Sequence, residues 1–190
     1  MRAYRGRMEL KTLFGLPAHP LMVHLPVVLI PLAGLIAIVF AFRTQWLDRF
    51  GWALVALSGV GALGGILAAG SGEGLEELGE RSPGVGEHAE MGEAARTFGI
   101  VFFLIVLAVV VARHLARRKG EGAQGVWGFV GSKAGAIVAA AALVVSAGAA
   151  TYTISVAGHQ GAKLVWEKEV KDQPAGGESG EGGDGDSDGD

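Results

Sequence analysis

Three histidines lie at the ends of the apolar segments of this chain and a fourth lies just inside the first segment, and these four are the side chains best suited to hold a metal ion or a cofactor. His19 and His24 lie in the stretch Gly-Leu-Pro-Ala-His-Pro-Leu-Met-Val-His-Leu-Pro (residues 15–26), His88 precedes the third apolar segment, and His159 follows the fourth. Neutral imidazole coordinates iron, copper and zinc well. Because ionisable groups are costly to place at a membrane, we predict that these four converge on one functional site.

The membrane assignment rests on the length of the apolar segments. Hydrophobic residues make up 50% of the chain and charged residues only 18%. A helix needs about 20 apolar residues to cross about 30 Å of hydrocarbon. The third segment reaches this length only if its helix continues back through residues 94–97 or forward through Arg113. The four segments are residues 21–42, 52–70, 98–112 and 134–157.

We therefore predict an all-α protein, a membrane bundle of four transmembrane helices with a disordered acidic C-terminal tail. The expected divisions are a basic N-terminal lead (1–16), a four-helix transmembrane domain (17–166) and the tail (167–190). Most of the tail is Gly, Ser, Glu and Asp, and it cannot bury enough apolar surface to fold. Gly61 and Gly65 have the spacing at which helices approach closely in membranes, so we expect both at a helix–helix contact.

The connections between the helices follow from proline, glycine and charge. The first helix is expected to begin near Pro20, with His19 just before it, since proline suits the first helical turn. We expect a turn at residues 43–49 and a glycine-rich, acidic connection at 71–96. The fourth helix is expected to end before Gly-His-Gln-Gly (158–161), where glycines allow backbone close to a bulky group.

The orientation follows from the basic residues. The two short connections, 43–49 and 113–133, carry seven Lys/Arg. The positive-inside rule places them in the cytoplasm, which puts both termini and the histidine site at the outer face of a bacterial inner (cytoplasmic) membrane. The basic residues of the lead favour the opposite orientation: Arg2, Arg5, Arg7 and Lys11.

Two pairs of histidines are candidates for axial ligands of a haem. His24 with His88 is the preferred pair, with His19 and His159 lining the pocket, and His24 with His159 is the alternative. His114 lies among arginines and is expected at the opposite end of the bundle.

Other side chains near His88 and His159 are secondary candidates. Met91 is a candidate thioether ligand, and Glu90 and Glu93 are candidate carboxylate ligands. Arg96 and Lys163 are within reach of the propionates of a haem. We expect Met91 to pack and the two glutamates to face water unless a metal recruits them.

The stretch at 15–26, the lone histidine before the third segment, and Gly-His-Gln-Gly-Ala-Lys-Leu-Val (158–165) resemble a bacterial membrane family, domain of unknown function 2231. The resemblance covers residues 15–166 and implies a four-span membrane protein. The family's histidine pattern is similar to that of b-type cytochromes. The matching positions in this chain are His19, His24, His88 and His159.

Three hypotheses on function remain at this point. The first is a haem b protein for electron transfer, and the chain's lack of cysteine means that such a haem would be held non-covalently. The second is a Cu, Zn or Fe site built from His24, His88 and His159 with a glutamate. The third is a structural membrane protein without a cofactor.

The expected partners are the lipid bilayer and an unidentified redox partner, with a homo-oligomer left open. Nucleic acid is not expected, because the net charge is −3 and the basic residues flank apolar segments. No nucleotide loop, nucleophile elbow or zinc-protease motif occurs in the sequence. A redox carrier or binding protein is therefore favoured over a hydrolase or transferase.

Overall fold

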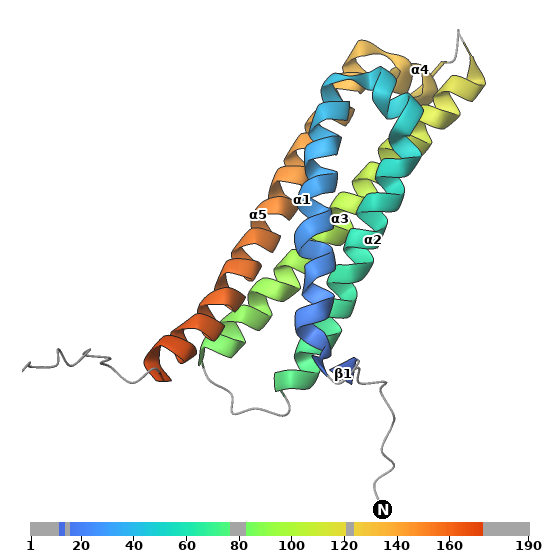
Figure 1. Cartoon of the computed structure of the whole chain (residues 1–190). Coiled ribbons are helices and arrows are strands. Elements are labelled where there is room, and N and C mark those ends of the chain that lie inside the picture. Colours follow the sequence, from blue (N-terminus) through green and yellow to red (C-terminus); the bar gives the residue numbers. More distant parts are fainter. Residues whose placement is uncertain (1–11, 14–15, 77–82, 121–123, 173–190) are drawn as a thin grey trace, which may run out of the picture.

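The computed structural model describes residues 12–13, 16–76, 83–120 and 124–172 (Figure 1). Most of the predicted basic lead and the predicted disordered tail from residue 173 onward lie outside these residues. The elements are β1 (Thr12–Leu13), β2 (Leu16–Pro17), α1 (Ala18–Phe42), α2 (Thr44–Glu76), α3 (Pro83–Lys119), α4 (Val126–Gly131) and α5 (Lys133–Asp172). β1 and β2 pair antiparallel just before α1.

The four long helices form one packed bundle, which confirms the predicted all-α fold. α1 and α3 each pack along both α2 and α5, so α1 and α3 face each other across the diagonal of the bundle (Figure 1). All four are long and apolar enough to cross a membrane. We name the two ends of the bundle by their residues. The histidine end carries His19 and His88, and the basic end carries the α1–α2 link and α4.

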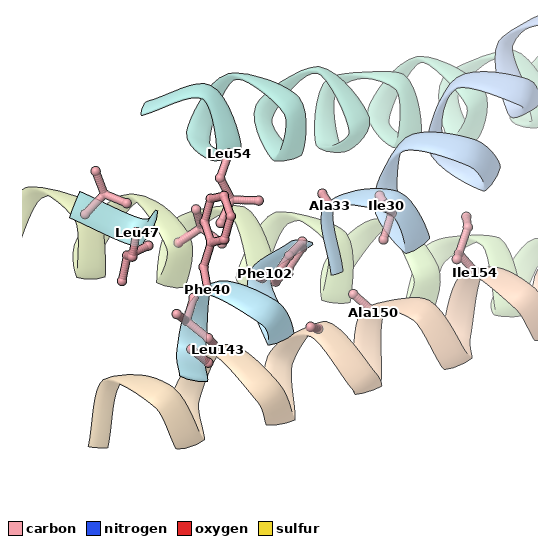
Figure 2. Packing of buried hydrophobic residues seen from close by; sticks show 14 of the residues in the cluster. Ile30, Ala33, Phe40, Leu47, Leu54, Phe102, Leu143, Ala150 and Ile154 are labelled. Carbon is pink, nitrogen blue, oxygen red and sulfur yellow. The ribbon is translucent and has the colours of Figure 1, made fainter. Parts of the chain in front are cut away.

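The core of the bundle consists of small and branched side chains and two phenylalanines, Phe40 and Phe102, and all four long helices contribute to it (Figure 2). Phe102 of α3 is completely buried, and alanines such as Ala33 and Ala147 let α1 and α5 approach. Lipid chains are as apolar as these residues, so close van der Waals packing contributes most of the helix association. The outward side chains, among them Leu35 and Val145, are exposed because lipid surrounds them.

Glycines of α2 bring it close to α1, as predicted. A methyl group at Gly61 would lie 3.1 Å from Ile30, and one at Gly64 would lie 2.8 Å from the Cβ of Leu25. Gly65 is buried and faces Pro26 and the backbone of α3. The prediction that Gly61 and Gly65 lie at a helix–helix contact is confirmed.

The helices are longer than the apolar segments that predicted them. The turn expected at 43–49 is wrong, because α2 begins at Thr44 and only Arg43 separates it from α1. The connection expected at 71–96 is mostly helical, since α2 runs to Glu76 and α3 begins at Pro83. In the second stretch the two helices continue through glycines although these have low helix propensity.

The ends of α1 and α5 also differ from expectation. α1 begins at Ala18, so His19 lies in its first turn and not before it. α5 passes through Gly158 and Gly161 without a break and continues beyond Trp166 to Asp172. α5 is rich in alanine and packs against the bundle with one face. The opposite face is exposed at Val145 and Tyr152.

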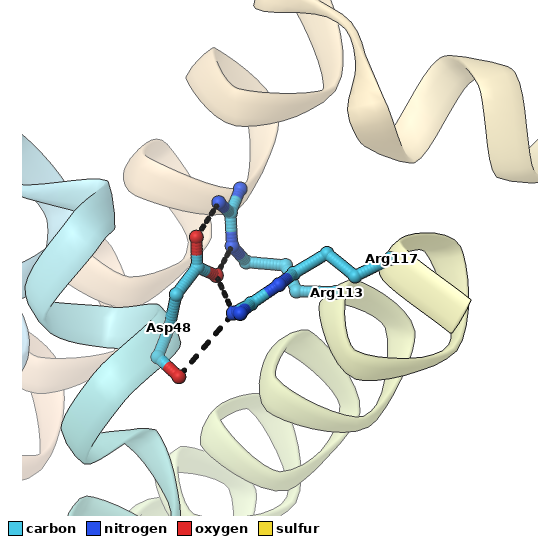
Figure 3. A network of polar contacts seen from close by, with 3 residues as sticks. All are labelled: Asp48, Arg113 and Arg117. Atoms are coloured by element: carbon cyan, nitrogen blue, oxygen red, sulfur yellow. Dashed lines mark hydrogen bonds and ion pairs between the residues drawn. The ribbon is translucent and has the colours of Figure 1, made fainter. Parts of the chain in front are cut away.

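The basic end of the bundle is tied together by an ion pair that the sequence analysis did not identify (Figure 3). Arg113 of α3 donates to both carboxylate oxygens of Asp48 in α2, at 2.8 and 3.0 Å. Arg117 lies 3.3 Å from the same carboxylate. The two arginines therefore fix the end of α3 against the beginning of α2.

Candidate cofactor site

His19 is held by one turn of α2. Its Nδ1 lies 3.0 Å from the carbonyl oxygen of Ala68 and 3.1 Å from Oγ of Ser71. The Ser71 hydroxyl also donates to the Ala68 carbonyl, at 2.8 Å. Gly72 completes this contact, since a methyl group there would lie 3.2 Å from Cε1 of His19. We call Ala68, Ser71 and Gly72 the anchoring turn.

The surroundings of His19 favour its neutral form. Burial lowers the pKa of His19, the Ala68 carbonyl partly offsets this by accepting a hydrogen bond, and the nearby His88 lowers the pKa further. His19 precedes the membrane-spanning part of α1, which begins at Leu21. A neutral imidazole has a lone pair on one ring nitrogen, and this is the form that binds metals.

His88 of α3 meets His19 across the bundle. The centroids of the two rings are 6.2 Å apart and the ring planes are perpendicular. Nδ1 of His88 is buried and has no hydrogen-bond partner in the described part of the chain. A buried polar atom left unpaired costs about 1–3 kcal/mol. The His88 ring thus stays packed against the other helices at this cost, with one nitrogen that makes no hydrogen bond to the described residues.

A glycine of α5 makes room for His88. A methyl group at Gly161 would lie 2.9 Å from Cε1 of His88, closer than side chains approach without a shift. The site thus draws on all four long helices: His19 from α1, Ser71 from α2, His88 from α3 and Gly161 from α5. We call His19 and His88 the histidine pair.

The other three histidines are not part of the histidine pair. His24 of α1 and His159 of α5 have exposed side chains, so their convergence with the histidine pair stays a prediction. His114 packs edge-on against Trp52 at the basic end, with ring centroids 6.1 Å apart. It is 26 residues beyond His88 in the same helix, about 39 Å along the axis, which agrees with the predicted separation.

The secondary candidates near His88 are not gathered around it. Met91 packs against the hydrophobic core, as expected. Glu90 is exposed, and Glu93 forms a 3.1 Å ion pair with Arg96. Lys163 is exposed as well. Among the described residues, no group of three or more His, Cys, Asp or Glu side chains is arranged to hold a metal ion.

The anchoring turn was missed by sequence reasoning. Ala68, Ser71 and Gly72 belong to Ala-Ala-Gly-Ser-Gly at the end of the second apolar segment, which was interpreted as the start of a loop. The continuation of α2 through Ser71 places the Ser71 hydroxyl and the Ala68 carbonyl oxygen beside His19 of α1. The only signal was the presence of a hydroxyl where the apolar segment ends.

Comparison with known proteins gives one match. A family model described as "Predicted membrane protein (DUF2231)" matches residues 15–174. None of the curated proteins and none of the solved structures gives a significant match to the chain.

Proposed function

The chain belongs to the predicted membrane protein family DUF2231, and we propose that it binds haem b between His19 and His88 for electron transfer. As a multi-pass membrane protein it would hold the haem within the bundle, close to one membrane face. The observation that carries this proposal is the histidine pair, two imidazoles contributed by diagonally opposed helices.

The spacing of the pair supports ligation of one metal centre. With metal–nitrogen bonds of about 2.0–2.1 Å, two imidazoles on opposite sides of one metal have their ring centres about 6 Å apart. The observed separation of the centroids is 6.2 Å. A six-coordinate haem iron takes only two ligands from the protein, since the macrocycle supplies four. Four-helix bundles commonly bind cofactors between facing helices.

The chemistry of the donors also fits a haem. Bound haem b would supply one-electron redox chemistry, with a potential set by its axial ligands and by burial. His19 is kept neutral by burial, and the unpaired Nδ1 of His88 leaves that ring available to a ligand. The proposed pair is thus His19 and His88, whereas the pair preferred from the sequence was His24 and His88.

A non-haem metal ion is the second candidate, and one specific observation favours it. Nδ1 of His88 is the unpaired atom, and a small ion bound there would satisfy it directly. Cu, Zn or Fe ions all accept imidazole nitrogen from either ring position. Such an ion would need further ligands from water or from side chains that move toward the pair.

The charge distribution supports the histidine end as the outer one. Arg43, Arg49, Arg113, Arg117, Arg118, Lys119 and Lys133 all lie at the basic end of the bundle. Under the positive-inside rule this end faces the cytoplasm of a bacterium. Exposed Glu87 and Glu90 lie beside the site at the other end, where a redox partner would approach.

An optical spectrum tests the proposal. The full chain, expressed with haem supplied and purified in detergent, should show the reduced-minus-oxidised bands of a six-coordinate haem. His19→Ala and His88→Ala should each abolish them, because each removes an axial nitrogen. His114→Ala at the basic end is the matched control and should keep the wild-type spectrum.

The outcomes separate the hypotheses. An unaltered spectrum in His88→Ala refutes this axial pair, and loss of the bands in His24→Ala would restore the pair expected from the sequence. Wild-type protein without haem, but with a stoichiometric metal by elemental analysis that His88→Ala lacks, would establish the metal-ion function instead.

A further inference from the structure

We infer that Ser71, together with the Ala68 carbonyl, holds His19 in the tautomer that is protonated at Nδ1, so that Nε2 is the nitrogen presented to a ligand. Ser71 is thus a positioning residue that acts through His19. The inference deepens the proposed function, and it rests on that function for the identity of the ligand.

The tautomer follows from the partners of Nδ1. A carbonyl oxygen can only accept a hydrogen bond, so the 3.0 Å contact with Ala68 requires a hydrogen on Nδ1 of His19. The Ser71 hydroxyl donates its own hydrogen to the same carbonyl oxygen, at 2.8 Å. Its lone pairs are then free to accept from Nδ1, which lies 3.1 Å away. Both contacts favour a hydrogen on Nδ1, and in the neutral ring Nε2 carries the lone pair.

The anchoring turn also fixes the direction of the ring. Ala68, Ser71 and Gly72 are three and four residues apart, and such residues share one face of a helix. That face of α2 receives the Nδ1–Cε1 edge of His19, with Gly72 contributing the space. Metal-binding histidines usually donate their second nitrogen to a carbonyl or carboxylate in the same manner, which fixes the tautomer and makes the ligand more basic.

A consequence for electron transfer follows from this hydrogen bond. With haem bound, donation from Nδ1–H to two acceptors would increase the electron density on Nε2 and would stabilise oxidised iron relative to reduced iron. Removing one acceptor should therefore raise the reduction potential. A single hydrogen bond changes an equilibrium by about twofold to tenfold, and a tenfold change corresponds to 59 mV for a one-electron couple.

The first test uses nitrogen NMR on the full chain in detergent, labelled with ¹⁵N-histidine and free of haem. His19, assigned by its absence from His19→Ala, should show the Nδ1–H tautomer. In Ser71→Ala the ratio of the Nδ1–H to the Nε2–H tautomer should fall by about twofold to tenfold, because one acceptor is lost. Ser71→Thr keeps the hydroxyl and should retain the wild-type ratio.

Ser58→Ala is the matched control on the same helix. The Ser58 hydroxyl is buried and donates within its own helix, to the carbonyls of Leu54 and Val55. It should leave the tautomer of His19 unchanged. Wild-type His19 in the Nε2–H tautomer, or a Ser71→Ala ratio equal to that of wild type, would overturn the inference.

The second test measures the reduction potential of the haem-loaded protein. Ser71→Ala should shift it upward, by at most about 59 mV, while Ser71→Thr and Ser58→Ala should match wild type. A Ser71→Ala potential equal to that of wild type would overturn the role of Ser71. If the wild type binds no haem yet shows the Nδ1–H tautomer and its dependence on Ser71, the proposed function fails and the positioning role stands.

Discussion

Replacing Gly161 with alanine should displace His88 and weaken the site. The added Cβ would lie 2.9 Å from Cε1 of His88, and ordinary contact begins at 3.4 Å. The ring or the α5 backbone must therefore move by about 0.5 Å, which equals the tolerance within which a binding site must be held. Overpacking of this kind costs about 1–3 kcal/mol. At about 1.4 kcal/mol per tenfold, the affinity for haem should fall by about fivefold to a hundredfold.

Gly158→Ala is the control for this change. It lies one turn earlier in α5, and among the described residues its added Cβ would meet only Val27, at 4.0 Å. Both substitutions gain the same helix propensity, about 1 kcal/mol, so the difference between them isolates the contact with His88. Haem titrations followed by absorbance give the affinities, and thermal unfolding in detergent gives the stabilities. Equal affinity and equal unfolding midpoints for the two variants would refute the placement of His88 against Gly161.

Three further predictions concern stability. Asp48→Asn should lower the free energy of unfolding by about 2 kcal/mol, because the side chains of Asp48 and Arg113 are only 23% and 17% exposed. Thermal unfolding should show this loss while the haem spectrum stays unchanged. A lost spectrum would contradict the separation of the two ends of the bundle. Because burial lowers the pKa of His19, the folded state binds its proton less readily than the unfolded state. The contribution of His19 to the free energy of unfolding is fully present above about pH 6.5 and is lost as the pH falls below that value. The wild type should have a lower unfolding midpoint at pH 5 than at pH 7.5, and this difference should be smaller in His19→Ala. An equal difference in the two proteins would contradict the assignment of the effect to His19. Gly64→Ala should destabilise by about 1–3 kcal/mol, since its Cβ would lie 2.8 Å from Leu25, whereas Gly70→Ala meets nothing within 4 Å and should not.

The number and place of the membrane helices could be predicted because apolar length alone determines them. The helix ends could not, because polar residues continue a helix wherever a neighbour supports it. α2 shows this at both ends: it begins at Thr44, where a turn was expected, and it passes Ser71, where a loop was expected. The Asp48–Arg113 pair was missed for the same reason, since residues assigned to a loop have no predictable face.

The choice of histidines shows what depends on helix rotation. His24 was expected to be the main ligand because it lies inside an apolar segment. α1 begins at Ala18, so His19 and His24 belong to one helix and are five residues apart, about 500° or 140° beyond a full turn. The two side chains therefore leave α1 in different directions, and in the structure His19 is half-buried whereas His24 is exposed. The packing of α1 against α2 places His19 beside Ala68. The residues of α1 alone could not predict this contact, because it depends on how the helix is rotated against α2.

Because only Arg43 separates α1 from α2, these two helices form a hairpin whose short link lets them enter the bilayer together. That hairpin already contains His19 and the anchoring turn, and chains begin to fold from the N-terminus during synthesis. His19 can thus be oriented before α3 is made, while His88 and Gly161 arrive with the later helices. A chain that stops after the hairpin would have half of the histidine pair. Binding of the proposed haem would therefore require that all four long helices are in place.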